Sequence, residues 1–246
     1  MRNMKVLNKN NKIWFSRKDS FSFLERDQDN IVRIKKVLNY LRDYRGKFSK
    51  KMKLLDLGCG DGYVGKKILD LGYLLYGLDI SKKNVGVCKK IGIDAKQGDV
   101  CKKFPFREKS FDVVFAGEII EHLYEVDFFL SEINRVLKPN GLLILTTPNL
   151  AHLPERWALF RGRSPSRVHP THKYLKLHIR HFTKDTVFEV LKNNAFLPIK
   201  FESSLVVFCR DKKNPDYVKM SSRCLANCFP GLGSFIICYA VKKNDI

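Results

Sequence analysis

The apolar residues of this chain follow two alternating periods, which predict helices and strands in turn. The first group has the spacing of an amphipathic helix, stops at Gly46 and consists of Ile31, Ile34, Val37, Leu38, Leu41 and Tyr44. Short, mainly apolar runs follow at 53–57, 111–115 and 142–146. Such runs are typical of strands that are buried on both faces of a sheet.

Helical patterns separate these strands. They cover 64–71, 126–137 and a stretch from Ser81, which can cap a helix, to about Ile91, while 73–78 is strand-like. Strands separated by helices need crossover connections, so we expect parallel pairing in an α/β sheet.

The last third of the chain begins with an irregular segment. Residues 147–182 contain several prolines, Gly162 and most of the histidines but no sustained period, and we interpret them as an insertion or lid. Thr183 can cap a further helix, and 196–207 and 234–241 supply the last two predicted strands.

Positive charge is concentrated in two segments. The chain carries 46 Lys and Arg against 25 Asp and Glu, a formal net charge of +21. Residues 1–53 carry 16 basic and 5 acidic side chains, 54–150 carry 13 of each, and 151–184 carry 8 basic side chains against Glu155. We therefore predict a basic N-terminal arm and helix over 1–50, and a domain over 51–246 with a basic lid at about 151–182. Either these charges simply face water or they meet an anionic partner.

The cysteines and the termini indicate a reducing compartment. The chain has seven cysteines, an odd number, and at this length it needs no disulfide framework. The paired spacing of a zinc site is missing among Cys209, Cys224, Cys228 and Cys238, so we expect buried free thiols. The first residues lack an apolar signal, and the longest apolar run, 235–241, is too short to span a membrane. We expect a cytoplasmic protein without a transmembrane segment. The oligomeric state is left open.

A glycine-rich loop after the first strand indicates a cofactor site. Gly58, Gly60 and Gly62 allow sharp turns and close approach of a ligand, but Asp56 and Asp61 would repel a pyrophosphate. These acids would instead favour a cationic ligand with a free amino group, such as S-adenosylmethionine. Asp79, at the end of the second strand, can accept both ribose hydroxyls, and Asp99 with Val100 can receive and line an adenine.

Four segments resemble the class I S-adenosylmethionine-dependent methyltransferases, in particular the subgroup of the ubiquinone-biosynthesis O-methyltransferases. They read LLDLGCGDG at 54–62, GLDIS at 77–81, FDVVFAGEIIEHL at 111–123 and VLKPNGLLILTTPN at 136–149. The resemblance implies a Rossmann-like seven-stranded, mostly parallel sheet with helices on both faces and an antiparallel last strand. It also implies methyl transfer from S-adenosylmethionine, bound by Asp56, Gly58, Gly60, Asp79, Ile80, Asp99, Val100, Ala116 and Glu118.

Catalytic candidates follow the fourth strand. Methyl transfer needs mainly alignment, and a base only if the acceptor must lose a proton. His122 is the best base by residue type, with Glu121 beside it, and the alternative is a histidine that only packs the lid. Glu118, Glu121 and His122 would share one side of a helix, if this segment is helical.

A divalent metal is an open alternative at the same residues. Glu118, Glu121 and His122 with His178 or His181 offer suitable oxygen and nitrogen donors, and a similar arrangement occurs in metal-dependent small-RNA 2′-O-methyltransferases. The tryptophan-containing pattern of those enzymes is missing here. We therefore assign no metal ligand from the sequence.

The lid suggests an anionic acceptor. Its basic residues are Arg156, Arg161, Arg163, Arg167, Lys173, Lys176 and Arg180, interleaved with Trp157, Phe160, Tyr174 and Phe182. We expect O-methylation of a small-molecule or glycan acceptor that bears negative charge. RNA methylation is the alternative, a non-catalytic cofactor-binding module is a remote one, and a dehydrogenase is more remote still.

Overall fold

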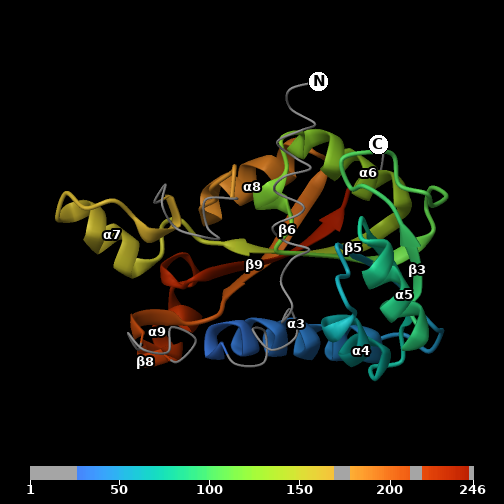
Figure 1. Cartoon of the computed structure of the whole chain (residues 1–246), viewed down its shortest axis with the longest axis horizontal. Helices are drawn as coiled ribbons and strands as arrows, with labels where there is room; N and C mark the ends of the chain where they lie inside the picture. The colour runs from blue at the N-terminus through green and yellow to red at the C-terminus, as the bar shows by residue number, and fades with distance from the viewer. Residues whose placement is uncertain (1–26, 169–177, 211–217, 244–246) are drawn as a thin grey trace.

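A seven-stranded sheet forms the centre of the computed structural model, which describes residues 27–168, 178–210 and 218–243 (Figure 1). The strand order is β3-β2-β1-β4-β5-β9-β6. The strands are β1 (Lys53–Leu57), β2 (Leu74–Asp79), β3 (Asp94–Gln97), β4 (Phe111–Gly117), β5 (Leu137–Pro148), β6 (Phe196–Ser203) and β9 (Phe235–Lys242).

The strand directions confirm the expected Rossmann-like fold. β1 pairs in parallel with β2 and β4, and β4 pairs in parallel with β5. β9, the last strand, runs antiparallel to both β5 and β6. The carboxyl ends of β1, β2, β4 and β5 therefore meet at one edge of the sheet, where ligands bind in open α/β folds.

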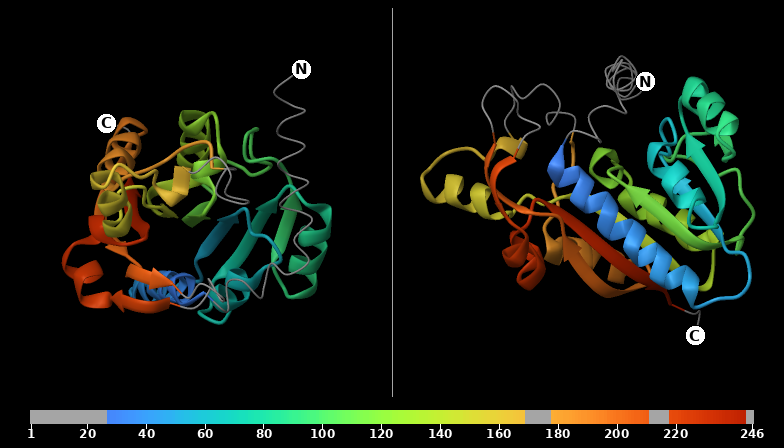
Figure 2. Two further views of the ribbon diagram at one scale, coloured as in Figure 1. Left: turned by 60° about the vertical axis from the view of Figure 1, so that its left-hand side comes forward. Right: turned by 90° about the horizontal axis from the view of Figure 1, so that it is seen from below.

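Helices cover both faces of the sheet, because neighbouring strand residues point to opposite sides. Leu54 belongs to an apolar cluster that includes residues of α3 (Gln28–Gly46), α4 (Tyr63–Leu69) and α5 (Lys82–Lys90). Leu55 belongs to a second cluster, which includes residues of α6 (Val126–Val136) and α8 (Lys184–Asn193). Two apolar clusters thus hold the sheet between two helical layers, as the side views show (Figure 2).

The predicted helix before the first strand lies against the sheet. α3 runs along β9, and the ring of Tyr40 stacks on that of Tyr239 at a centroid distance of 3.8 Å. The Asp27 side chain caps α3 by accepting a hydrogen bond from the Asp29 backbone N–H. Arg33 is buried on this helix and reaches the carboxyl end of the sheet.

The sequence predictions for the irregular parts need three corrections. The segment 196–207 is two strands, because the chain leaves β6 at Ser203 and forms a separate hairpin of β7 (Val206–Arg210) and β8 (Val218–Ser222). The expected lid contains a helix, α7 (Leu153–Phe160), that the periodicity did not indicate. Three thiols expected to be buried are exposed, those of Cys209, Cys224 and Cys228.

The remaining elements are short. α9 (Arg223–Cys228) follows β8, and 3₁₀ turns cover η1 (Ile120–His122), η2 (Ser166–Val168) and η4 (Pro230–Leu232). Within the described ranges, no helix combines the length and apolar character required to cross a membrane.

Candidate functional site

The glycine loop after β1 adopts a conformation that favours glycine. Gly58, Gly60 and Gly62 have φ angles of 68°, 54° and 82°, in the left-handed region that other residues rarely adopt. The Gly58 N–H donates to the Leu78 carbonyl oxygen at 2.8 Å, which ties the loop to the end of β2. A Cβ at Gly58 would lie 2.8 Å from the Cδ1 atom of Ile119, so the Ile119 side chain would have to shift to make room.

Asp79 joins this loop to the second strand. Its carboxylate accepts hydrogen bonds from the backbone N–H groups of Gly60 at 2.9 Å and Ser81 at 2.8 Å. Burial raises the pKa of the Asp79 carboxyl, while these hydrogen bonds oppose the rise. Asp79 thus fixes the distance between the carboxyl ends of β1 and β2. Ser81 caps α5, as predicted, by accepting from Asn84.

Asp56 is buried at the end of β1. Burial, followed by the negative charge of Asp79, raises the pKa of the Asp56 carboxyl to about 8. A nearby positive charge would favour the ionised form of this carboxyl group and lower its pKa. The electrostatics of this loop therefore favour a cationic ligand over a pyrophosphate.

The other cofactor candidates lie on adjacent loops. The Gly98 N–H donates to the Asp79 carbonyl oxygen at 3.0 Å, so the loop that carries Asp99 and Val100 follows the end of β2 closely. Asp99 accepts a hydrogen bond from the Cys101 N–H, and Ile80 is exposed. Ala116 is fully buried on β4. The predicted residues thus lie around the carboxyl edge of the sheet.

Glu118 lies just beyond β4, in a strained backbone conformation with φ of 55°. Its N–H donates to the Thr146 carbonyl oxygen, and its carboxylate accepts from the Thr146 hydroxyl, each at 3.0 Å. Burial raises the pKa of this carboxyl to about 7, although the positive charge of Arg33 lowers it. Burial thus opposes ionisation of Glu118, and the charge of Arg33 favours it.

Arg33 is a site residue that the sequence reasoning missed. Its guanidinium donates to the Thr146 hydroxyl at 2.8 Å and lies 3.6 Å from the Glu118 carboxylate. Asn30 accepts two further hydrogen bonds from it, and the ring of Phe235 lies beneath it at 5.1 Å. Arg33 is 113 residues from Thr146 in the sequence. The one sequence signal for its role was its spacing from the apolar residues of the predicted helix, which turns the Arg33 side chain toward the sheet.

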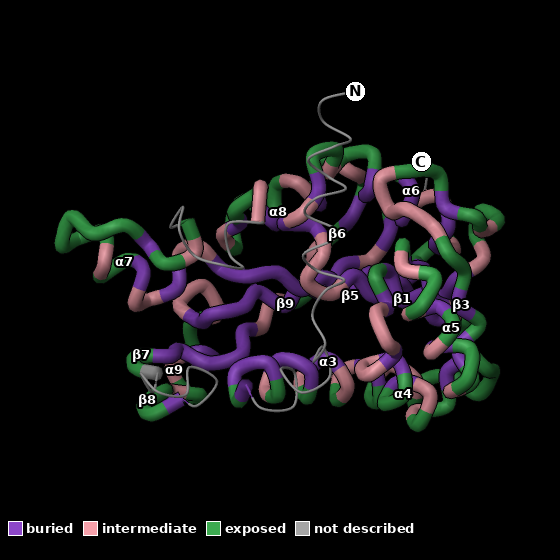
Figure 3. The backbone as a smooth tube through the Cα atoms, viewed as in Figure 1, coloured by how far each residue is buried: buried purple, intermediate pink, exposed green. Residues whose placement is uncertain are grey.

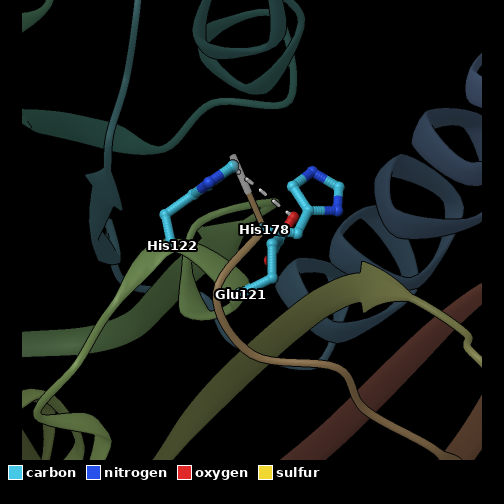
Figure 4. A group of neighbouring side chains, drawn as sticks. All are labelled: Glu121, His122 and His178. Carbon is cyan, nitrogen blue, oxygen red and sulfur yellow. Dashed lines mark ion pairs between the residues drawn. The ribbon is translucent and has the colours of Figure 1, made fainter. Parts of the chain in front are cut away.

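Glu121, His122 and His178 converge in the segment beyond β4 (Figure 4). Glu121 and His122 belong to η1, so the 3₁₀ turn brings them together, whereas Glu118 precedes it. The His122 imidazole lies 3.9 Å from the Glu121 carboxylate and contacts the ring of His178 edge-on at 4.8 Å. The N–H groups of Ile179 and Arg180 both donate to the Glu121 carbonyl oxygen, which holds this segment over the site.

Glu121 has the electrostatic features of a proton-transfer group or a metal ligand. It is buried, accepts a hydrogen bond from the Thr147 hydroxyl at 3.0 Å, and burial raises its pKa to about 7. Ligand atoms of Glu121, His122 and His178 lie within 4.8 Å of one another. Of the residues considered for a metal, this group contains neither Glu118 nor His181.

The lid arginines separate into different environments. Arg156 donates to the carbonyl oxygens of Ala151 and Gly231, and the Arg161 guanidinium lies over the Trp157 ring. Arg167, by contrast, returns to the sheet, donates to the Ser234 carbonyl oxygen at 3.0 Å, and its charge lowers the pKa of Glu118 and Glu121. Lys173, Tyr174 and Lys176 lie outside the described residues.

Comparisons with known proteins agree on the core. A family model described as a methyltransferase domain matches residues 55–145. The ubiquinone biosynthesis O-methyltransferase of Pelagibacter ubique is 36% identical over 131 residues, which cover 49% of this chain and 54% of that protein. The chain thus spans about half the length of this relative. The enzyme of the same name from Agrobacterium fabrum is 28% identical over 177 residues, 67% of this chain and 70% of its own.

Solved structures extend the likeness in fold to most of the chain. The Burkholderia thailandensis 1,6-didemethyltoxoflavin-N1-methyltransferase, with S-adenosylhomocysteine bound, has a TM-score of 0.63 at 14% identity, covering 98% of this chain and 90% of that one. The [4+2]-cyclase SpnF has a TM-score of 0.58 at 18% identity and covers 85% and 82%. One fold therefore accompanies different reactions, and the reaction must be inferred from the site.

Proposed function

Since this chain belongs to the class I S-adenosylmethionine-dependent methyltransferases, we propose that it transfers the cofactor's methyl group to an oxygen atom of a small-molecule or glycan acceptor that bears negative charge. The strongest support is the hydrogen bond that links the ends of β1 and β2. There Asp79 accepts a hydrogen bond from the Gly60 N–H, beside the buried carboxyl group of Asp56. S-Adenosylmethionine is the methyl donor.

The cofactor fits the charges of this edge. Its amino group and its sulfonium are positive, which suits a loop whose carboxyl group has a pKa raised by burial and a neighbouring acid. Gly58 and Gly60 allow the backbone to approach the methionine part closely. Asp79 and Ile80 would hold the ribose and the adjoining edge of the adenine. Asp99 and Val100 would hold the adenine ring itself. Ala116 and Glu118 would form the floor beneath the sulfonium.

The reaction is an in-line displacement. When bound, S-adenosylmethionine would supply a methyl carbon activated by the sulfonium, and its carbon–sulfur bond would break with the electron pair going to sulfur as the acceptor oxygen bonds to that carbon. His122 would take the hydroxyl proton, and the Glu121 carboxylate, 3.9 Å away, would stabilise the resulting imidazolium. The protein contributes mainly alignment and exclusion of water.

Arg167 supports an anionic acceptor. It is the lid arginine whose charge acts on both Glu118 and Glu121, so an acceptor carboxylate or phosphate bound there would lie beside the site.

In this organisation the segment at about 151–182 is a substrate lid on a domain over 51–246, and 1–50 is an arm and helix. We place the protein in the cytoplasm.

Incubation with methyl-labelled cofactor and fractionated cell extract, read by mass spectrometry, tests the proposal. We expect label on an acidic small molecule or glycan. Label on RNA, with binding that weakens log-linearly with salt, would replace this acceptor class with the alternative. No label in any fraction, despite cofactor binding, would instead favour a binding module.

A further inference from the structure

Two cysteine thiols are in contact at the glycine loop. Cys59 lies in this loop between Gly58 and Gly60, and Cys88 lies on α5, 29 residues further along the chain. Their sulfur atoms are 3.7 Å apart, and the Cys88 thiol also donates a hydrogen bond to the Gly60 carbonyl oxygen at 3.3 Å. A thiol of α5 is therefore attached to the loop that we assign to the cofactor.

The pair is enclosed by the protein on both sides. Cys59 is 7% exposed and Cys88 is fully buried. In the tube coloured by burial, α5 combines exposed positions with buried ones (Figure 3), and Cys88 is one of the buried residues. A Cβ at Gly77 would lie 2.8 Å from the Cys59 sulfur, and one at Gly62 would lie 3.2 Å from the Cys88 sulfur. The two sulfur atoms thus occupy space that neighbouring glycines leave to them.

A small movement of the loop would bring the two sulfur atoms to bonding distance. A disulfide bond is about 2.05 Å long, so the sulfur atoms, now 3.7 Å apart, would have to approach by roughly 1.7 Å. Cys59 has a glycine on each side, and glycine backbone reaches conformations that other residues avoid. The loop can therefore supply this movement, but only by displacing Gly58 and Gly60 from their present positions.

We propose that Cys59 and Cys88 form a redox switch, in which hydrogen peroxide oxidises them to a disulfide that displaces the glycine loop and weakens S-adenosylmethionine binding. The effect on the cofactor rests on the proposed function of the loop, whereas formation of the disulfide does not. In a reducing compartment such a disulfide is transient, because cellular thiols reduce it again.

The oxidation proceeds in two steps. The Cys59 sulfur, as a thiolate, attacks one oxygen of the peroxide, the O–O bond breaks, and the leaving oxygen takes up a proton, which gives a sulfenic acid and water. The Cys88 sulfur then bonds to the Cys59 sulfur, the S–O bond breaks, and the thiol proton leaves with the oxygen as a second water. Two thiols thus lose two electrons to one peroxide.

The closed loop protects the pair. Hydrogen bonding with Cys88, followed by burial, raises the pKa of the Cys59 thiol. Because the thiolate is the reactive form, oxidation requires the loop to open first. A bound cofactor would hold the loop closed, so S-adenosylmethionine should slow formation of the disulfide.

Peroxide treatment of the full chain, followed by alkylation and peptide mass spectrometry, tests the proposal. We expect a disulfide-linked pair of peptides that contain Cys59 and Cys88, formed more slowly when S-adenosylmethionine is present. Isothermal titration should show cofactor affinity reduced by about tenfold or more in the oxidised protein and restored by dithiothreitol. Cys88→Ser keeps a hydrogen-bond donor but cannot close the disulfide, so its affinity should survive the same treatment.

The exposed thiols of α9 provide the matched control. The double variant Cys224→Ser, Cys228→Ser removes two thiols that lie one helical turn apart, and it should respond to peroxide like the parent. The proposal is overturned if the linked peptides do not form, if they form without loss of affinity, or if Cys88→Ser loses affinity equally. A reduced parent that does not bind S-adenosylmethionine would instead refute the proposed function and with it the effect on the cofactor, while the linked peptides would still establish the disulfide.

Discussion

Replacing Asp56 with asparagine should stabilise the ligand-free protein at alkaline pH and weaken cofactor binding. Burial, with the charge of Asp79, raises the pKa of Asp56 from its ordinary value of 3.8 to about 8. Between these values the unfolded chain has lost the proton that the folded chain keeps, so the free energy of unfolding falls as pH rises from about 4 to about 8. Asparagine is neutral throughout and should remove this decline.

The magnitude follows from the same difference in pKa. At about 1.4 kcal/mol per pKa unit, the interval from 3.8 to about 8 sets an upper limit of roughly 6 kcal/mol at alkaline pH. Local relaxation and water penetration reduce such penalties, so we expect the variant to gain about 2–3 kcal/mol relative to the parent between about pH 5 and about pH 8.5.

Urea denaturation of parent and variant at these two pH values measures the effect. Asp61→Asn is the matched control, because this acid lies in the same loop without being fully buried. It should show no such pH-dependent gain. The reasoning is refuted if Asp56→Asn gains the same stability at both pH values, or becomes less stable than the parent at alkaline pH. A thermal shift by S-adenosylmethionine should be smaller for Asp56→Asn, because asparagine cannot ionise beside the bound cation as Asp56 can.

Three further variants probe the site. Gly58→Ala and Gly60→Ala should each lower the free energy of unfolding by about 1–2 kcal/mol, because their φ angles of 68° and 54° lie in the left-handed region; unchanged stability in urea denaturation would contradict this. If His122 acts as a base, His122→Ala should lower kcat with little change in cofactor Kd, and chelators should leave the activity of the parent unchanged. Activity that is lost on chelation and restored by Mn²⁺ would instead assign a metal site to these residues. Arg33→Ala should raise the pKa of Glu118 further, since the Arg33 charge lowers it, and an unchanged NMR titration of Glu118 would show that the two are not coupled.

The core of the fold could be predicted because its strands and helices bury complete apolar patterns. β4 is a mainly apolar run, and Ser81 and Thr183 cap their helices where the sequence indicated. α7 was missed because its apolar side chains are exposed and leave no buried stripe for periodicity to detect. The segment 196–207 was predicted as one strand because apolar residues recur on both sides of Ser204. In the structure the Leu205 N–H donates a hydrogen bond to the Asp29 carboxylate instead of to a neighbouring strand, which separates β6 from β7.

The candidate site was predictable where its residues follow strands and not where tertiary contacts assemble it. Asp56 and Asp79 end consecutive strands, so their proximity follows from parallel pairing. Arg33 joins the site from a helix before β1, and His178 from a segment after β5, and no local pattern specifies these distances. The positive φ of Glu118 likewise depends on its contacts with Thr146.

Isothermal titration with S-adenosylmethionine and its demethylated product tests the central claim most directly. We predict saturable binding of both to the parent, with affinity lost in Asp79→Asn, whose side chain can no longer accept the Gly60 N–H and the ribose hydroxyls as a carboxylate does. NAD should give no heat of binding. Binding of NAD in preference to S-adenosylmethionine, or equal cofactor affinity in parent and Asp79→Asn, would contradict the account.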